Sequence, residues 1–245
     1  MIWIFPIAGY GTRTSILGPY KPFIEIFKDH KILKLCLMGI KSHIKKDDKL
    51  VFIASREQEE QHNVTRNVEI IVNDLGLKTK NIISILNKTP SGQALTIKHG
   101  LKGIKEEFKT EKVFVINSDQ MVTFDLENID FSRPGTGLYF NIGDKSCFYK
   151  LDFNSKTIID IKEKQKISCY ASAGVFYFNT LDVMMRSIEW AIKNKKTYNG
   201  ELYLGPCMEY FGNLSYFPTT MKFDLGNVRS IEFFKSTFNF WEKKI

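Results

Sequence analysis

The stretch PIAGYGTRTSILGPYKPF, residues 6–23, decides the fold. It is rich in glycine, it carries Arg13 and Lys21, and it follows directly on the first apolar segment of the chain. Gly9 and Gly11 would let backbone N–H groups approach a phosphate without interference from a Cβ atom. Arg13 could add charge-assisted hydrogen bonds, and Lys21 a compact point charge. The stretch is therefore either an ordinary glycine-rich connection or a loop that holds phosphates.

The segments that follow alternate between two patterns. Short apolar runs typical of buried strands occur at 1–9, 49–55, 81–87 and 112–119. Helical spacing of apolar residues occurs between them, at 31–46, 56–77 and 92–108. This alternation predicts βαβ units and a mostly parallel sheet flanked by helices, with the glycine loop at the carboxyl ends of the strands, where such sheets bind ligands. The fold class is therefore α/β and Rossmann-like.

The pattern of expected strands and helices changes after about residue 130. Shorter strand-like segments are expected at 135–143, 147–153, 158–164 and 173–179. Helices are predicted at 180–196 and 201–212, and the aromatic-rich segment 230–244 is expected to pack on the body of the protein. With 245 residues and no linker or repeat, the chain is predicted to form a single domain, 1–245. Its half at about 1–125 would bind a nucleotide, and its half at about 126–245 a second substrate.

Composition excludes several classes of protein. No apolar run approaches the roughly 18 residues of a membrane span, and the start of the chain lacks the basic region of a signal peptide. The four cysteines have no metal-ligand spacing and are expected to be reduced thiols, which points to the cytoplasm. The net charge of +8 comes from scattered lysines and arginines, so a solvated basic surface is favoured over a nucleic-acid interface.

Two common phosphate-binding loops fit residues 6–23 poorly. The P-loop pattern GxxxxGK[ST] is absent, and the dinucleotide-binding pattern would need a glycine where this chain has Thr14. Asp29 stands near the distance at which that pattern places an acidic residue, so spacing alone does not exclude it. It does not account for Arg13 or for the Lys21-Pro22 pair.

Residues 8–22, AGYGTRTSILGPYKP, resemble the G-x-G-[TS]-R…K-P signature of the sugar-phosphate nucleotidyltransferases. The matching residues are Gly9, Gly11, Thr12, Arg13, Lys21 and Pro22. The spacer before the lysine is short and is similar to that of subgroups from polysaccharide gene clusters. The resemblance implies a GT-A-like nucleotidyltransferase fold and a role in nucleotide-sugar supply. It also implies Mg²⁺-dependent joining of a nucleoside triphosphate to a sugar 1-phosphate, with release of pyrophosphate.

Six further segments resemble the family in the expected order, up to about residue 226. They contain Gly92 and Gln93 in the base-reading loop, Asp119 and Asp224 as metal carboxylates, Glu163 and Lys164 as the Glu-Lys pair, Gly174 beside the sugar, and Glu201 as a sugar contact. One departure is Asn227-Val228, where the family often has Thr-Pro.

The roles that this resemblance implies are specific. Ala8, Gly9, Gly11, Thr12, Arg13, Gly92 and Gln93 would bind the nucleotide, and Glu163, Lys164, Gly174 and Glu201 the sugar phosphate. Arg13, Lys21 and Asp119 would be catalytic, because two phosphates that react need charge neutralisation more than a strong base. Magnesium keeps several waters, so two carboxylates, Asp119 and Asp224, would hold it.

Each residue also has a plain structural interpretation. Asp119 and Asp224 could cap the segments that follow them, Glu163 and Lys164 lie in a run of charges, and Glu201 could favour a helix dipole. A glycosyltransferase, a non-catalytic nucleotide sensor and transfer to phosphocholine remain open as functions. A glycosyltransferase would usually want D-x-D where this chain has Ser118-Asp119-Gln120. The base, the sugar and a homo-oligomeric state are not determined by the sequence.

Overall fold

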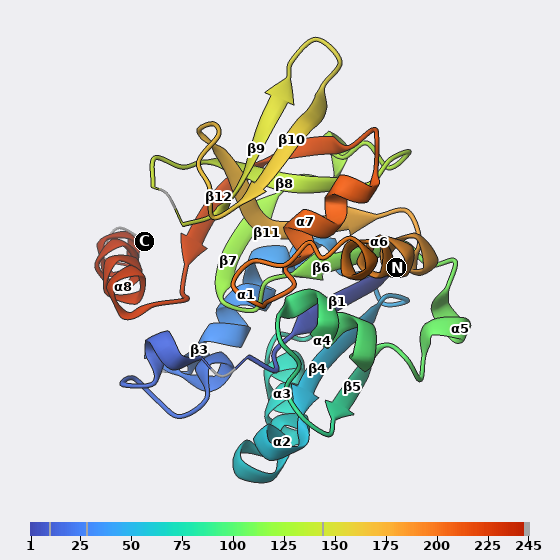
Figure 1. The fold of residues 1–245 in the computed structure, drawn as a ribbon. Helices are drawn as coiled ribbons and strands as arrows, with labels where there is room; N and C mark the ends of the chain where they lie inside the picture. The colour runs from blue at the N-terminus through green and yellow to red at the C-terminus, as the bar shows by residue number, and fades with distance from the viewer. Residues whose placement is uncertain (10, 28, 144, 243–245) are drawn as a thin grey trace.

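The computed structural model describes residues 1–9, 11–27, 29–143 and 145–242, with the side chains of Thr12 and of 238–242 left out. One ten-stranded sheet runs through the molecule, and helices cover both of its faces (Figure 1). Its strands are β1 (Ile2–Pro6), β4 (Lys49–Ser55), β5 (Lys80–Leu86), β6 (Val113–Ile116), β7 (Gln120–Phe124), β8 (Gly135–Phe140), β9 (Cys147–Asp152), β10 (Thr157–Glu163), β11 (Tyr170–Phe178) and β12 (Ser215–Asp224). The helices are α1 (Ile32–Ile40), α2 (Arg56–His62), α3 (Val64–Asp74), α4 (Gln93–Gly100), α5 (Lys105–Phe108), α6 (Leu181–Lys193), α7 (Leu204–Cys207) and α8 (Val228–Glu242).

The sheet is mixed, which confirms the predicted fold class. Its main order is β5-β4-β1-β6-β11-β8-β12-β7, and β9 and β10 form an antiparallel hairpin beside β11. The first four strands are parallel, as is β12 to β8, whereas β11 and β7 run antiparallel to their neighbours. A small separate hairpin joins β2 (Glu25–Phe27) to β3 (His30–Lys31).

The central strands bury both faces, and the two faces differ in chemistry. Along β1, Ile2 and Ile4 belong to one buried cluster, while Trp3 and Phe5 belong to the other. The second cluster contains stacked rings, with Trp3 and Phe114 4.6 Å apart between centroids. Along β1, strand alternation thus sends aliphatic groups to one side and aromatic groups to the other. We call these sides the aliphatic face and the aromatic face after the β1 residues, although Phe176 and Phe178 also belong to the first cluster. A strand buried on both faces needs such a near-continuous apolar run, as the sequence predicted.

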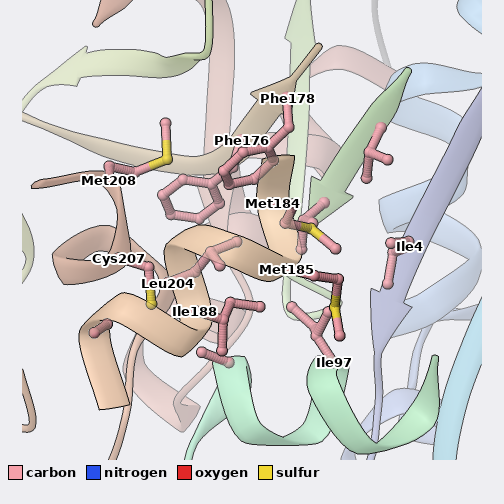
Figure 2. Close-up of a cluster of buried hydrophobic side chains, with 14 of the residues drawn as sticks. Ile4, Ile97, Phe176, Phe178, Met184, Met185, Ile188, Leu204, Cys207 and Met208 are labelled. Atoms are coloured by element: carbon pink, nitrogen blue, oxygen red, sulfur yellow. The ribbon is translucent and has the colours of Figure 1, made fainter. Parts of the chain in front are cut away.

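The aliphatic face packs against α4, α6 and α7, and the aromatic face against α1 and α3. Figure 2 shows the aliphatic cluster, in which Met184, Met185 and Ile188 of α6 approach Ile97 of α4 and Ile4 of β1. α6 begins at a Thr180 cap, whose side chain accepts from the amide of Val183 at 3.1 Å. These helices leave the carboxyl ends of β1 and β6 uncovered.

Three predicted helices are wrong in extent. The helix expected at 56–77 is two helices, because Asn63 adopts a left-handed conformation (φ 47°) that ends α2 and begins α3. The helix expected at 92–108 is interrupted between α4 and α5, where Gly103 contributes little helix propensity. The helix expected at 201–212 shrinks to α7 and a 3₁₀ turn, Met208–Tyr210.

Two strands, β7 and β12, were not predicted. β12 carries Pro218 and has an irregular register against β7, so it shows no clean alternation of apolar residues. β12 leaves β8 to pair with β7, which brings residue 224 to Gln120 at the start of β7. β12 thereby forms one side of the cavity that is described below.

The C-terminal aromatic segment forms α8, at the side of the sheet (Figure 1). Phe234 is buried against Phe223, whereas Phe233 is exposed. The side chains of Phe238, Phe240 and Trp241 lie outside the described residues. Within the described part of the chain, no helix has both the length and the apolar character that crossing a bilayer requires. The division into halves at about residue 125 stays a prediction.

Candidate active site

A cavity of about 570 Å³ opens at the carboxyl ends of β1 and β6. The loop after β1 forms one wall, and the end of β10 with residues 201–205 forms the opposite wall. The end of β12 adds a third side. The predicted site residues that line it are Gly9, Arg13, Lys21, Gly92, Gln93, Asp119, Glu163, Lys164, Glu201 and Asp224. Topology therefore brings together residues that lie more than two hundred positions apart in the sequence.

Hydrogen bonds from side chains outside the glycine loop hold its backbone in place. Gln58 of α2 donates through Nε2 to the carbonyls of Ala8 at 3.0 Å and Gly9 at 3.3 Å, and Thr89 donates to Ala8 at 3.1 Å. Ala8 is buried and is not part of the cavity lining. Among the described residues, the amides of Gly9 and Gly11 have no acceptor. The carbonyls of Ala8 and Gly9 are thus satisfied, while the unpaired amide of Gly9, which lines the cavity, remains available to a ligand.

Gly11 is required by the path of the loop. Its φ of 63° is in the left-handed region, and an added Cβ would stand 2.8 Å from Cβ of Lys21. Thr14, fully buried, donates to the Gly11 carbonyl at 3.0 Å, and Tyr20 donates to the Ile7 carbonyl at 2.8 Å. Gly11 therefore shapes the loop instead of lining the cavity. The side chain of Thr12, also predicted to bind nucleotide, lies outside the described residues.

Lys21 and Asp119 form an ion pair at the centre of the cavity. Nζ of Lys21 lies 2.7 Å from Oδ2 of Asp119, and the two side chains are 15% and 19% exposed. Burial by itself would raise the pKa of the Asp119 carboxyl, but Lys21 and Arg13 outweigh it and hold this pKa below its usual range. Asp119 is consequently an anion across the physiological range. Arg13 is exposed at the rim of the cavity.

Asp224 faces the same small space as Asp119. Asp224 Oδ1 accepts from the amide of Gly226 at 2.9 Å, and Oδ2 accepts from Asn227 at 3.2 Å. A Cβ on Gly226 would stand 2.9 Å from both Asp119 Oδ2 and Asp224 Oδ1. Both carboxylates therefore lie against Gly226 and close to each other, and a pair of neighbouring carboxylates is a donor set that suits Mg²⁺, which takes oxygen ligands and retains waters. The residues present therefore fit the predicted metal. Asn227, which departs from the family pattern, serves here to orient Asp224.

Gly92 approaches protein backbone. At φ 101° it precedes α4, and an added Cβ would stand 2.5 Å from the backbone nitrogen of Leu202. Around it, Leu202 donates to the Ser91 carbonyl at 3.2 Å and accepts from the Ala94 amide at 3.0 Å. The Ser91 hydroxyl donates to the Gly200 carbonyl at 2.9 Å. The predicted base-reading loop and the predicted sugar-contact segment are thus joined directly to each other.

Gln93 contacts polar side chains in the same cavity as the Lys21–Asp119 ion pair. Its Nε2 donates to Oδ1 of Asn117 at 2.6 Å. Gly174 does not line the cavity: at φ 73° it lies behind Asn117 and Gln120, and its Cβ would stand 2.8 Å from Cγ of Asn117. Oε1 of Gln120 is buried and has no hydrogen-bond partner among the described residues. An orphaned amide at a cavity wall suits a ligand that carries hydroxyl groups.

Glu163 and Lys164 form the far wall with Tyr203. Lys164 lies 3.6 Å from Glu163, and its Nζ stands 5.4 Å from the centroid of the Tyr203 ring. Burial raises the pKa of the Glu163 carboxyl, since its side chain is only 8% exposed, and Lys164 opposes the shift. Glu201 is exposed and accepts a hydrogen bond from the Tyr203 hydroxyl. This wall offers a cation, two carboxyls and an aromatic face.

Several lining residues were not found in the sequence. They are Asn117, Ser118, Gln120, Tyr139, Lys145, Ser146, Cys147, Tyr203 and Lys222. Asn117, Ser118 and Gln120 flank the predicted Asp119, and the convergence of polar groups after a buried strand could have indicated them. Tyr139 lies on a strand without a functional motif, whereas Lys222 is the first residue of the segment KFDLGN, in which only Asp224 was assigned a role.

Comparison with models of known protein families finds no match, and comparison with curated proteins finds none either. Solved structures do match. A nucleoside-diphosphate-sugar pyrophosphorylase from Vibrio cholerae RC9 has a TM-score of 0.83 at 20% identity, over 96% of this chain and 100% of that one. A UDP-glucose pyrophosphorylase complexed with UDP-glucose has a TM-score of 0.71 at 15% identity, over 100% and 99%.

A third match is a CTP:phosphocholine cytidylyltransferase from Streptococcus pneumoniae, with a TM-score of 0.66 at 13% identity, over 97% of this chain and 99% of that one. The three proteins differ in acceptor by their names, while the arrangement of the chain is shared over nearly the full length of each. Their likeness to this protein concerns architecture. The chain has the fold of the sugar-phosphate nucleotidyltransferases and related cytidylyltransferases.

Proposed function

We propose that the protein joins a nucleoside triphosphate to a sugar 1-phosphate and releases pyrophosphate. One observation carries the proposal: a single cavity holds the Lys21–Asp119 ion pair together with two differently equipped groups of residues. One group is Arg13 with the free amide of Gly9, and the other is Glu163 with Lys164. A triphosphate and a phosphorylated acceptor would meet at the pair. The shared fold with nucleotidyltransferases supports this assignment.

The glycine loop would bind the β- and γ-phosphates. The amide of Gly9, which lines the cavity, lacks a protein acceptor among the described residues, and Arg13 at the rim adds a delocalised cation. Such groups stabilise pyrophosphate as it leaves, because they are aimed in advance at the place where negative charge accumulates. Lys21, behind the loop, would neutralise charge at the α-phosphate.

Magnesium would supply further charge neutralisation at the α-phosphate, held by Asp119 and Asp224. The two carboxylates lie close together beside Gly226, and the depressed pKa of Asp119 keeps it ionised and able to ligate. Lys21 Nζ is hydrogen-bonded to Asp119 Oδ2, so it fixes the orientation of that carboxylate. Two carboxylates in a site for a polyanion have little use other than to hold a cation.

The proposed transfer needs no strong base. A phosphate oxygen of the acceptor attacks the α-phosphorus, the new P–O bond forms, and the bond from the α-phosphorus to the bridging oxygen breaks. The electron pair leaves with pyrophosphate, and no proton has to move for this exchange. Positioning and charge neutralisation are then the main contributions of the protein. Lys164 would hold the acceptor phosphate, and Glu163 and Glu201 would accept hydrogen bonds from sugar hydroxyls.

The test is release of pyrophosphate. Purified protein with Mg²⁺ is mixed with CTP, UTP, dTTP, GTP or ATP against a panel of sugar 1-phosphates and phosphocholine. One productive pair is expected, and it names both substrates. Lys21→Ala and Asp119→Ala should each reduce kcat/KM by at least about a hundredfold, the order of a lost transition-state donor.

Lys34→Ala is a matched control for Lys21→Ala. Lys34 is 14% exposed and pairs with Asp74 at 3.2 Å, so it resembles Lys21 in burial and pairing but lies outside the cavity. Its activity should equal that of the wild type. Failure of every triphosphate to bind would contradict the proposal and favour a glycosyltransferase. Triphosphate binding without turnover of any pair would contradict the choice of acceptors.

A further inference from the structure

Lys222 is a cation of the cavity to which the motifs assign no role. It lies on β12 two residues before Asp224, and alternate residues of a strand share a face. Both side chains line the cavity. Lys222 therefore stands beside the carboxylates that converge for the metal.

The ammonium of Lys222 is half-buried and forms no direct ion pair. Among the described residues, no carboxylate lies within 4.0 Å of its Nζ, although its charge acts on the nearby Asp119 carboxylate, whereas Lys21 and Lys164 both have ion-pair partners at the site. Its Nζ lies over the face of the Tyr139 ring, 4.1 Å from the centroid. A ring face attracts an ammonium more weakly than a carboxylate does and leaves its N–H donors free. The group is held in place and can still bind an anion.

Tyr139 is itself fixed. Its hydroxyl accepts from Asn141 Nδ2 at 2.7 Å and lies 3.2 Å from the Ser146 hydroxyl. The same wall includes Lys164, whose amide donates to the Ser146 carbonyl at 2.9 Å. Lys222 on Tyr139 and Lys164 on Tyr203 are thus two ammonium groups, each backed by an aromatic ring, in one cavity.

We infer that Lys222 binds the anionic group of the acceptor and, together with Lys164, holds it beside the metal carboxylates. The inference rests on the proposed function for the identity of the acceptor, but the subsite itself rests on Lys222 and Tyr139. A phosphate monoester carries close to two negative charges at neutral pH. Lys164 is paired with Glu163, whereas Lys222 has no carboxylate within 4.0 Å, so the two lysines together supply positive charge to match that anion.

The same geometry selects the rest of the acceptor. A quaternary ammonium such as choline is bound by open aromatic faces. The faces of Tyr139 and Tyr203 are each covered by a lysine, which would repel it. The acceptor is therefore a phosphate monoester of an uncharged, hydroxyl-bearing group.

The test uses the whole protein and inorganic phosphate as the probe. Calorimetry measures phosphate binding with Mg²⁺ and saturating pyrophosphate present, so that the glycine loop is filled first. Lys222→Gln should weaken phosphate binding at least tenfold, and Lys222→Arg should stay within about threefold of the wild type. Lys112→Gln is the matched control, because Lys112 also covers an aromatic ring, Phe131 at 4.8 Å, outside the cavity.

Absence of phosphate binding to the wild type, or equal weakening by Lys222→Gln and Lys112→Gln, would overturn the inference. Thermal melts of all variants show whether each is folded. Phosphocholine binding tenfold tighter than phosphate would overturn the acceptor class. Binding of phosphate that depends on Lys222, in a protein that does not bind pyrophosphate or triphosphates, would support the subsite and contradict the proposed function instead.

Discussion

Gly174 shows how one missing side chain can position two others. Its φ of 73° and its closeness to Asn117 and Gln120 leave no room for a Cβ. The two amides consequently stand at the cavity wall next to Asp119. Gly174 resembles a family residue that lies beside the sugar, but here it acts indirectly, by positioning two amide side chains that line the cavity.

Gly174→Ala is expected to lower kcat/KM for the acceptor at least tenfold, because Asn117 and Gln120 must move. Gly76→Ala provides a control for backbone strain, since Gly76 has a φ of 65° and open space around its Cβ position. Both variants should lose roughly 1 kcal/mol of unfolding free energy from the left-handed conformation. Kinetics and chemical denaturation measure the two effects, and equal kinetics for the two variants would contradict the positioning role.

Glu163→Gln should separate stability from function. The pKa of the buried Glu163 carboxyl is raised, so the folded state holds its proton to higher pH than the unfolded state does. Burial of the carboxylate then destabilises the fold as the pH rises above about 4.3, the ordinary value for Glu. Compared with the wild type, the variant should be equally stable near pH 4 and more stable, on the order of 1 kcal/mol, at neutral pH.

Denaturation of both proteins across pH 4–8 measures this difference, and a constant difference would contradict the raised pKa. Acceptor KM should rise in the variant at neutral pH, because the amide places a donor where the carboxylate accepts. Lys162→Gln, next to Glu163 on the exposed side of β10, should change neither quantity.

The sequence identified residues whose chemistry is tied to a motif, and missed those whose role depends on distant neighbours. Lys21, Asp119 and Asp224 meet as predicted because strand ends share one edge of the sheet. Lys222 became visible only through the path of β12, which no periodicity predicted. Gly92 was predicted to approach a base, yet its nearest neighbour is the backbone of Leu202, a contact across more than a hundred residues.

At the scale of elements, the break between α2 and α3 shows what periodicity cannot detect. Apolar spacing continues from 56 to 77, so the sequence predicts one helix. Asn63, with φ 47°, ends the first helix by donating its amide to the Glu59 carbonyl at 2.9 Å. Asn tolerates this conformation better than other residues with a Cβ. The break lets Gln58 face the glycine loop while α3 packs on the sheet.

Asn63→Ala should reduce the free energy of unfolding by about 1 kcal/mol, because alanine adopts the left-handed conformation less readily than asparagine does. Asn63→Gly should be near neutral, since glycine adopts positive φ without a steric cost. Urea denaturation measures both. Equal destabilisation by the two substitutions would show that the Asn63 side chain, and not the backbone conformation, supports the break.

At the scale of the whole molecule, the sheet is a rigid platform with chemistry at one edge. Apolar packing on both faces fixes β1 and β6 in the centre of the molecule. The polar residues then gather where these strands end. Ligand binding should therefore stabilise the entire fold, because the cavity walls come from both ends of the chain.

A triphosphate at a hundred times its dissociation constant should add about 2.7 kcal/mol to the free energy of unfolding. For a chain of this length, that corresponds to a rise in Tm of roughly 5–10 °C. Thermal scans with Mg²⁺ measure the shift. Lys21→Ala should abolish it and Lys34→Ala should keep it, and a shift of the same size in Lys21→Ala would remove Lys21 from the nucleotide site.

The direct joining of residues 91–94 to residues 200–202 has a consequence for attempts to redesign the protein. The two segments share backbone hydrogen bonds and a contact too close for a methyl group at Gly92. Grafting either one from a homologue would leave its partner mismatched. Under the proposed function, a library that aims at a new base should therefore vary both segments together. Its members should be tested with several acceptors, because a change in the segment near the nucleotide also displaces the segment near the acceptor.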